Sequence, residues 1–390
     1  MQYPRLRFNC QEFSGSFGDI GTDLPLLVGL ITVAHLSSAS VFTLFGLGQV
    51  LSGVIYGLPM PLQPLKAMAV IVMTQKLSGQ TLWAGGFLIA LIMLALSLSG
   101  ALSWLARVIP LPVVRGCQFG LGLSLASLAL KTYIPDGNTW GYLLAGLGFL
   151  ILVGLPKQKG IPAGLVVIGL GLLYACSIGL PWSRIITGIQ WQTPEFQTLD
   201  PAALLPGLFL LALPQLPLSI SNAVISTQQT AQDLFPEKPL SIRRIGLTYG
   251  LVNLIVPFFG GVPVCHGCGG LVGHYALGAR TGGAVVMYGG LYLIVGLLFS
   301  AVFNDVLGIF PMPILGVILL FEAWGLLSLI GDQVQESQDW MIALLVAVIA
   351  FSVPQGFLIG TVVGTGLYYL GQYTPLNLQK VKPESPPCQP

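Results

Sequence analysis

Four ionisable residues lie inside long apolar stretches of the sequence, namely Asp19, Asp23, Lys66 and Glu322. A charge at the centre of a bilayer costs roughly 2.5 to 3.5 kcal/mol on insertion scales, so such residues usually serve ion pathways or proton relays. Asp19 and Asp23 are four residues apart and share one helix face. We expect Asp23 to carry a proton, with Asp19, Glu322 and His266 as further coupling groups. The alternatives are an interfacial helix cap for Asp19 and a structural bond to a broken helix for Glu322.

Lys66 follows a break rich in proline and glycine, in the segment GLPMPLQPLKAMAVIVMTQ at residues 57–75. A helix that begins at such a break presents its positive dipole end and its free N–H groups to the surroundings. We expect Gln63 to cap this helix, Pro64 to take its first position and Lys66 to lie in its first turn. An anionic ligand would offset the costs of burying Lys66 there. The alternative is a structural ion pair with a carboxylate.

A second break has the sequence GGVPVCHGCGGLVGHYALG, at residues 260–278. Its small residues let the backbone approach a ligand closely, and we expect a helix to begin near His266, which offers a hydrogen bond or a titratable proton. Cys265 and Cys268 form a CxxC pair, but an isolated pair is weak evidence for a metal. We therefore expect neither a metal nor a cofactor. His35 and His274 are expected at segment ends.

Two such helix starts that face each other near mid-membrane would form an anion site. A third wall is expected from LPQLPLSISN at residues 213–222, where two prolines and several polar groups interrupt an apolar span. The residues expected to surround the anion come from these three segments: Gln63, Leu65, Lys66, Ala67, Gln215, Ser219, Asn222, Cys265, His266, Gly267, Cys268 and Gly269.

Composition identifies the solvent in which these residues must be positioned. The chain has 390 residues, of which 54% are hydrophobic and 8% are charged, whereas soluble domains carry roughly 25% charged residues. This excludes a soluble protein. A net charge of +2 is too small to indicate a nucleic-acid partner. An enzyme is not expected either, because no nucleophile, base and orienting group recur at matched depth.

The apolar segments predict an all-α polytopic membrane protein. A spanning helix needs about 20 apolar residues, and twelve segments qualify, starting near residues 17, 39, 82, 111, 140, 161, 203, 245, 283, 312, 339 and 355. The two broken segments raise the prediction to fourteen. The tail at 372–390 is polar and proline-rich, and we expect it to be disordered.

The basic residues predict the orientation of these segments. With fourteen segments, twelve Lys and Arg fall on the side of both termini, three fall on the other side, and Lys66 stays within the membrane. Cytoplasmic loops carry the excess of Lys and Arg, so we expect both termini in the cytoplasm. The three on the far side are Lys76, Lys131 and Arg184.

A faint internal repeat accompanies this pattern. Pro110-Leu111-Pro112 and Pro311-Met312-Pro313 each open an apolar segment, and the two breaks recur at a similar interval of about 200 residues. Two halves of seven segments would then have opposite orientations, which is typical of secondary transporters. The alternative is chance recurrence in a proline-rich chain. Gly116-x3-Gly120 is expected to mark a close helix contact.

Four motifs carry a family resemblance: FGDIGTDLPLL, PMPLQPLKAMA, ALPQLPLSISNAV and GGVPVCHGCGGLVGHYALGAR. Together they resemble the molybdate transporter family, which is related to the sulfate permease superfamily. The resemblance implies a 7+7 inverted repeat in which segments 3 and 10 are half-helices. It also implies a core domain at 1–106 (segments 1–4) and 199–303 (segments 8–11), and a gate domain at 107–198 (segments 5–7) and 304–371 (segments 12–14).

The resemblance implies a secondary active transporter that imports molybdate, coupled to protons, by alternating access of the core against the gate. The alternatives are a carrier of sulfate or another tetrahedral anion, and an anion channel. The expected partners are molybdate and the lipid bilayer, with tungstate or sulfate as alternative anions and a homodimer as an alternative to a monomer. We expect a multi-pass protein of the plasma (inner) membrane.

Overall fold

The computed structural model describes residues 6–136, 139–155, 163–180 and 182–373. Within these ranges the chain is almost entirely helical. Seven helices are long and apolar enough to span a membrane, or eight if the bent pair α1 (Cys10–Ser16) and α2 (Ile20–Ala34) forms one span. The bend between α1 and α2 is 43°. The predicted class, a helical membrane protein, is confirmed, while helix length and composition by themselves do not establish the count of fourteen.

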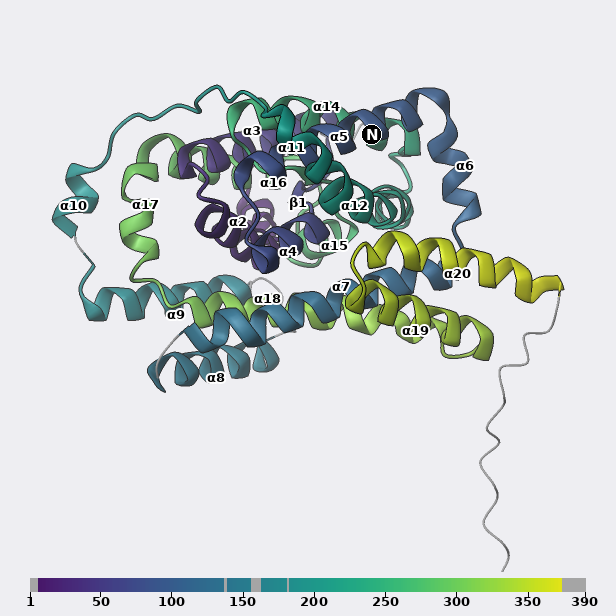
Figure 1. Cartoon of the computed structure of the whole chain (residues 1–390). Coiled ribbons are helices and arrows are strands. Elements are labelled where there is room, and N and C mark those ends of the chain that lie inside the picture. The colour runs from purple at the N-terminus through teal and green to yellow at the C-terminus, as the bar shows by residue number, and fades with distance from the viewer. Residues whose placement is uncertain (1–5, 137–138, 156–162, 181, 374–390) are drawn as a thin grey trace, which may run out of the picture.

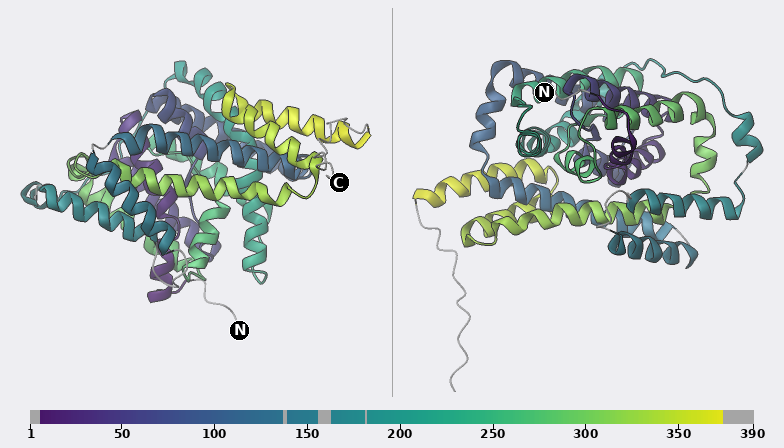
Figure 2. Two further views of the ribbon diagram at one scale, coloured as in Figure 1. Left: turned by 90° about the horizontal axis from the view of Figure 1, so that it is seen from below. Right: turned by 180° about the vertical axis from the view of Figure 1, so that it is seen from behind.

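The helices form two layers, which are visible in Figure 1 and from behind in Figure 2. We call the larger one the half-helix layer, because it contains the two short helices that follow the breaks. It comprises α1, α2, α3 (Ser38–Tyr56), α4 (Lys66–Gln75), α5 (Gly79–Ser99), α11 (Pro201–Pro206), η3 (Gly207–Ala212), α12 (Leu213–Leu218), η4 (Ser219–Ser226), α13 (Thr227–Leu234), α14 (Ile242–Ile255), η5 (Val256–Phe259), α15 (Cys268–Ala276), α16 (Gly283–Ile294) and η6 (Val295–Phe299).

The second layer lies along one side of the half-helix layer. It comprises α7 (Leu111–Leu128), η1 (Ala129–Tyr133), η2 (Ile134–Asp136), α8 (Thr139–Gly154), α9 (Ala163–Ile178), α18 (Met312–Ser328), η7 (Leu329–Gln333), α19 (Ser337–Ser352) and α20 (Gly356–Tyr373). Three helices connect the layers: α6 (Ala101–Val108), α10 (Trp182–Thr187) and α17 (Ser300–Leu307). Because α20 continues to Tyr373, the first two residues of the predicted disordered tail are helical, and 374–390 lie outside the described residues.

Local sequence explains where several helices begin. Ser37, Ser78 and Ser241 each precede a helix, and each side-chain hydroxyl accepts a hydrogen bond from the N–H three residues later. Such caps satisfy one of the amides that the first turn leaves without a helical partner. Serine therefore marks the starts of α3, α5 and α14.

Close glycine contacts hold neighbouring helices together. A Cβ on Gly116 or Gly120 of α7 would lie 2.5 Å from the carbonyl oxygen of Ala343 or 2.7 Å from the Cβ of Ala350, both in α19. The predicted close contact is confirmed. In the half-helix layer, α3 packs against α16 and α5 packs against α14, while α7 packs against both α18 and α19 in the second layer.

The chain remains helical through residues 213–222, where the sequence predicts an interruption. Residues Pro201–Leu234 form one continuous helical segment of 34 residues, in which η3 and η4 are π-helical turns on either side of Pro214 and Pro217. Wider turns of this kind accommodate a proline that cannot donate a backbone hydrogen bond. The prolines therefore reshape this helix without breaking it.

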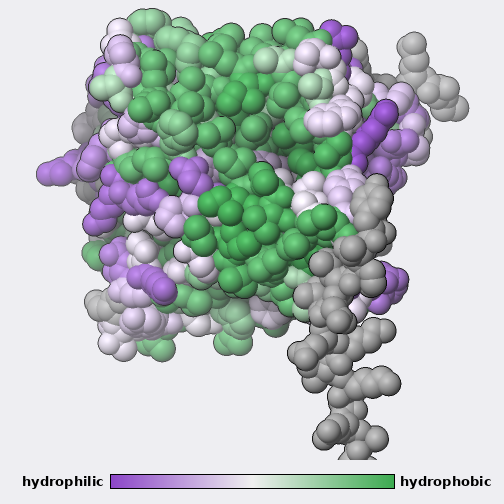
Figure 3. Space-filling model, turned by 45° about the vertical axis from the view of Figure 1, so that its right-hand side comes forward, coloured by the Kyte–Doolittle hydropathy of each residue, from purple (hydrophilic) through white to green (hydrophobic). Residues whose placement is uncertain are grey.

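Large apolar side chains cover much of the outer surface. Leu98, Leu150, Leu173 and Ile186 are each more than 60% exposed. Figure 3 shows broad hydrophobic areas on one face, with the hydrophilic residues gathered mainly toward its margins. A soluble monomer rarely exposes contiguous apolar patches of more than a few hundred Å². A surface with so many exposed apolar side chains is suited to contact with lipid.

Candidate functional site

Two short strands bring the two chain breaks together. β1 (Gln63–Pro64) pairs antiparallel with β2 (Val264–Cys265), with Gln63 opposite Cys265 and Pro64 opposite Val264. Helix α4 follows β1 and α15 follows β2, so the two helices leave this small sheet in opposite directions. Their N-termini flank it, as Figure 1 shows around β1. The first-turn amides of both helices therefore face one region of the protein interior.

Two buried carboxamides that the sequence reasoning missed hold these breaks in place. The side chain of Gln49 in α3 donates to the carbonyl of Leu62 at 2.7 Å and accepts from the Leu62 amide at 3.1 Å. Asn253 in α14 donates to the carbonyl of Val264 at 2.6 Å and accepts from its amide at 2.7 Å. Each side chain thus replaces the strand neighbour that the unwound backbone lacks. A buried amide at matching positions before both breaks is the sequence signal that could have identified them.

The start of α4 differs from the prediction. The helix begins at Lys66 with Leu65 as its N-cap residue, while Pro64 belongs to β1 and Gln63 does not cap the helix. The cap comes from Gln215 of α12, whose side-chain oxygen accepts from the amide of Met68 at 3.1 Å. The reason is that the strand pairing, including a bond from the Leu65 amide to the carbonyl of Pro263, keeps residues 63–65 extended. The Leu65 amide, expected to face the anion, therefore has a protein partner.

Gln63 connects the break to Asp19. Its side-chain nitrogen donates to both carboxylate oxygens of Asp19, at 2.6 and 2.8 Å. Asp19 precedes α2 in the N-cap position, as the structural alternative proposed, but it makes no side-chain cap bond and is only 2% exposed. A Cβ on Gly267 would lie 1.8 Å from the side-chain oxygen of Gln63, and one on Gly270 would lie 2.2 Å from an oxygen of Asp19. Glycine at both positions lets α15 pack against this pair.

Lys66 lies in the first turn of α4 as predicted, and its ammonium pairs with Glu322 of α18. The pair joins the half-helix layer to the second layer. The Lys66 side chain is 6% exposed and that of Glu322 is 24% exposed. The predicted alternative, an ion pair between Lys66 and a carboxylate, is therefore present. An ammonium in the first turn of a helix opposes the helix dipole, and a negative partner compensates for this.

Asp23 is fully buried in α2 and accepts a hydrogen bond from the hydroxyl of Tyr288 at 3.0 Å. The Tyr288 hydroxyl also contacts that of Tyr292 at 3.1 Å. The other carboxylate oxygen of Asp23 is buried without a hydrogen-bond partner. A buried carboxylate with an unsatisfied oxygen is costly in its charged form and calls for a proton or a cation.

His266 lies in the strand region before α15, which begins at Cys268 with Gly267 as its N-cap residue. One ring nitrogen contacts the carbonyl of Pro61 at 3.1 Å, and the other contacts the hydroxyl of Thr248 at 2.9 Å. Both nitrogens therefore have partners within the half-helix layer. The imidazole braces the two breaks against α14.

Asn222 of η4 contacts Cys268 at the start of α15, where the two layers meet. The side-chain oxygen of Asn222 accepts from Gln118 of α7 at 2.9 Å and from the Cys268 thiol at 3.3 Å. Gly269 is exposed, and a Cβ there would meet no atom within 4 Å. The first turn of α15 therefore opens onto free space at Gly269, whereas Ser219 and Cys265 are buried. Ala67, the second residue of α4, is also buried.

The remaining two histidines both lie at helix ends, as expected. His35 ends α2 in a left-handed conformation, with φ of 53°, as expected for a segment end. His274 lies in the last turn of α15, where it is fully buried and one ring nitrogen contacts the carbonyl of Gly15 at 2.7 Å. Close packing of α15 against the junction of α1 and α2 explains this burial, because Gly18 and Gly273 allow the backbones to touch.

The family described as "Molybdate transporter of MFS superfamily" matches residues 11–125 and 207–326. Molybdate transporter 2 of Arabidopsis thaliana is 33% identical over 95% of this chain and 89% of its own length. The chain belongs to the molybdate transporter family. Molybdate transporter 1 of Chlamydomonas reinhardtii is 27% identical, over 90% of both chains.

Solved structures show which fold this family member has. The transmembrane domain of the cyanobacterial bicarbonate transporter BicA superposes with a TM-score of 0.68 at 16% identity, covering 90% of this chain and 97% of that one. Murine Slc26a9, an anion transporter solved in the inward-facing state, gives a TM-score of 0.71 at 15% identity, covering 95% and 70%. This molybdate transporter family member therefore has the fold of these anion transporters.

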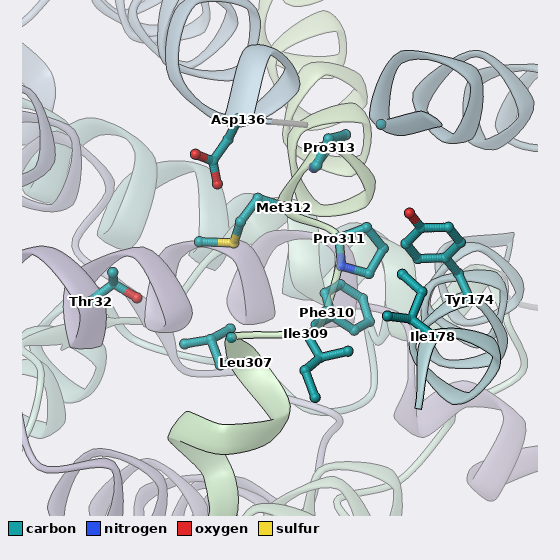
Figure 4. Close-up of a pocket in the computed structure, with 12 residues that line it drawn as sticks. Thr32, Asp136, Tyr174, Ile178, Leu307, Ile309, Phe310, Pro311, Met312 and Pro313 are labelled. Atoms are coloured by element: carbon teal, nitrogen blue, oxygen red, sulfur yellow. The ribbon is translucent and has the colours of Figure 1, made fainter. Parts of the chain in front are cut away.

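Two cavities lie where the layers of this molybdate transporter family member meet. One, of about 550 Å³, is lined by Thr32 of α2, Asp136, Tyr174 and the residues 307–313 that lead into α18. Figure 4 shows Thr32 on one side of Met312 and Tyr174 on the other. The second, of about 330 Å³, lies between the end of α4 and the connection from α19 to α20. Both cavities therefore lie at the boundary between the two layers.

Proposed function

We propose that this protein is a secondary active transporter that imports molybdate. Family membership and the curated relatives named as molybdate transporters support the substrate. The relatives are transporters, which also favours transport over enzyme catalysis. The observation that carries the proposal is that two half-helices begin on one small sheet, with Lys66 in the first turn of α4 and open space at Gly269 in the first turn of α15.

The two layers are proposed as the moving parts, with the half-helix layer as the core domain and the second layer as the gate domain. The proposed boundaries are those stated above: 1–106 and 199–303 for the core, 107–198 and 304–371 for the gate. Contacts between the two layers run from α2 to α18 and α9, from α4 to α7, and from α12 to α7 and α20. Alternating access would tilt the core against the gate and expose the site to each side in turn.

Helix pairing supports a 7+7 inverted repeat. Helices α3 and α16 pack together, and so do α5 and α14. In the repeat, α3 corresponds to α14 and α5 corresponds to α16, so exchanging the two halves of the chain turns the first pair into the second. The same exchange relates the pairing of α7 with α19 to that of α18 with α8. It also relates Gln49 to Asn253, about 200 residues later, each of which holds the break in its own half.

The proposed anion position is the region between the two half-helix starts. The ammonium of Lys66, the amides of Lys66 and Ala67, and the first-turn amides at Gly267–Gly269 would donate to the oxyanion. Gln63, Gln215 and Asn222 would orient this shell, since each side chain contacts a neighbour at the site. Ser219, Cys265 and His266 support the shell from behind.

Proton coupling is proposed because a dianion is imported against the membrane potential. Each charge costs about 2.3 kcal/mol per 100 mV when the inside is negative, so concentrative uptake needs a cotransported cation. Asp23, whose buried carboxylate has an unsatisfied oxygen, is the preferred proton site, with Asp19 and Glu322 as further groups. We also propose the plasma (inner) membrane as the location, with both termini in the cytoplasm.

Uptake of labelled molybdate into proteoliposomes tests the proposal. An inward proton gradient should drive accumulation above equilibrium, and a protonophore should abolish it. Unlabelled anions should compete in the order tungstate, then sulfate, then phosphate, because tungstate matches molybdate in size while a loosely held sulfate leaves buried donors unpaired at about 1 to 3 kcal/mol each. Equal competition by sulfate and tungstate would instead indicate a general sulfate-type carrier, and ohmic anion current would indicate a channel.

A further inference from the structure

The ion pair between Lys66 and Glu322 connects the two layers at the proposed anion position. Among the described residues, two salt bridges between side chains are present, and the other, between Arg115 and Asp332, lies within the second layer. Lys66 belongs to the first turn of α4, and Glu322 lies near the middle of α18. Glu322 is therefore a carboxylate from the second layer that is placed at the positive start of a half-helix.

Acidic side chains outnumber basic ones around this pair. Asp19, which precedes α2, and Asp23 in α2 both interact electrostatically with Lys66 and Glu322, as does Cys268 at the start of α15. On the helices packed against α18, Arg115 is held by Asp332 at 2.5 Å and the Tyr133 hydroxyl donates to the carbonyl of Pro25 at 3.0 Å. Neither group reaches Glu322 by a hydrogen bond in the part of the chain that the structure describes. Lys66 is the basic side chain among these acidic groups.

We propose that Glu322 is a tethered competitor of the substrate: its carboxylate neutralises Lys66 when the carrier is empty, and the oxyanion replaces it at Lys66 when the carrier is loaded. This inference rests on the proposed function. An ionised Glu322 and a dianion at one ammonium would repel each other in a site of low dielectric constant. Substrate binding therefore moves a proton from the aqueous phase onto the Glu322 carboxylate, and the neutral acid releases Lys66 to the anion.

The competition also explains why the carboxylate comes from α18. A partner on the half-helix layer would travel with Lys66 in every conformation, whereas Glu322 reaches Lys66 only when the layers are close. Exchange of Glu322 for the oxyanion removes the ion pair between the layers at the moment of loading. The protonation state of Glu322 thus determines whether Lys66 is available to the anion. Asp23 remains a second proton site with its own partner, Tyr288.

Equilibrium binding of molybdate to the purified full-length protein tests this inference. In the wild type, affinity should rise as pH falls from about 8.5 to 6.5, approaching tenfold per pH unit, because one proton is taken up per anion bound. In Glu322→Gln the affinity should vary less than twofold over this range and should match or exceed that of the wild type at the lower pH. Asp305→Asn, which removes an exposed carboxylate of α17 outside the site, should keep the wild-type pH dependence.

The outcomes separate this inference from the proposed function. A Glu322→Gln protein that is folded but keeps the wild-type pH dependence overturns the inference, and so does one that binds molybdate more than tenfold more weakly at every pH. If Glu322→Gln does not fold, Glu322→Asp serves instead: its shorter side chain contacts Lys66 less well, so affinity at the higher pH should rise severalfold, and unchanged affinity overturns the inference. A wild type that binds no molybdate at any pH overturns the proposed function, and this inference with it.

Discussion

Lys66 is the residue on which the proposed anion binding depends most directly. Replacing it with alanine should weaken molybdate binding about ten- to hundredfold, because hydrogen bonds to charged groups contribute roughly 1.5 to 3 kcal/mol. Lys76, exposed at the far end of α4, provides the matched control, and Lys76→Gln should bind as the wild type does. Equilibrium binding measures both variants. Wild-type affinity in a folded Lys66→Ala protein would assign Lys66 a structural role only.

Gly267 and Gly269 make a second test at the residue scale. A methyl group at Gly267 would lie 1.8 Å from the side-chain oxygen of Gln63, whereas one at Gly269 would meet no atom within 4 Å. Gly267→Ala must displace Gln63 from Asp19, and overpacking of this kind typically costs about 1 to 3 kcal/mol. Gly269→Ala should leave stability nearly unchanged. Thermal unfolding in detergent compares the two, and equal melting temperatures would contradict the packing described here.

At the scale of elements, the two breaks depend on the helices that hold them. Gln49 and Asn253 each replace a missing strand neighbour with two hydrogen bonds to one residue. Removing such a partner leaves a buried backbone donor and acceptor unsatisfied, at about 1 to 3 kcal/mol per group. The half-helix starts therefore depend on α3 and α14 for their position.

Asn253→Leu and Gln49→Leu should each destabilise the protein by several kcal/mol and weaken molybdate binding, because the half-helix starts lose their alignment. Leucine keeps the approximate volume of the side chain while removing its polar atoms. Gln229→Leu is the control: Gln229 is exposed on α13, and surface substitutions usually change stability by less than about 0.5 kcal/mol. Chemical unfolding gives the free-energy differences. A loss no greater than that of the control would show that the breaks hold their shape without these carboxamides.

At the scale of the whole molecule, the proposed orientation can be tested with the protein's own cysteines. Cys10 and Cys176 are both exposed. Fourteen segments would place Cys10 on the cytoplasmic side of the membrane and Cys176 near the end of α9 that faces the opposite side. In variants that keep only one of the two, a membrane-impermeant maleimide should label Cys176 in intact cells and Cys10 only after permeabilisation. Labelling of both from the same side would contradict the proposed topology.

The sequence by itself determined the solvent, the structural class and the positions of the two breaks that form the candidate site. Long apolar runs with few charges exclude a soluble fold, and proline with glycine inside such a run breaks a helix, because both effects act within a few residues of chain. Lys66 in the first turn of a half-helix follows from the same local rules, and α4 begins at that residue. The four family motifs supplied the family, which the comparisons confirm.

Only the tertiary structure decided which groups meet. Gln63 bonds Asp19 and leaves the capping of α4 to Gln215, His266 has partners on both ring nitrogens, and Lys66 pairs with Glu322, 256 residues away along the chain. No local rule gives these partners, because a buried polar side chain takes whichever group the packed helices bring within hydrogen-bond distance. The sequence placed the charges in the membrane, and the packing of two layers decided how each charge is neutralised.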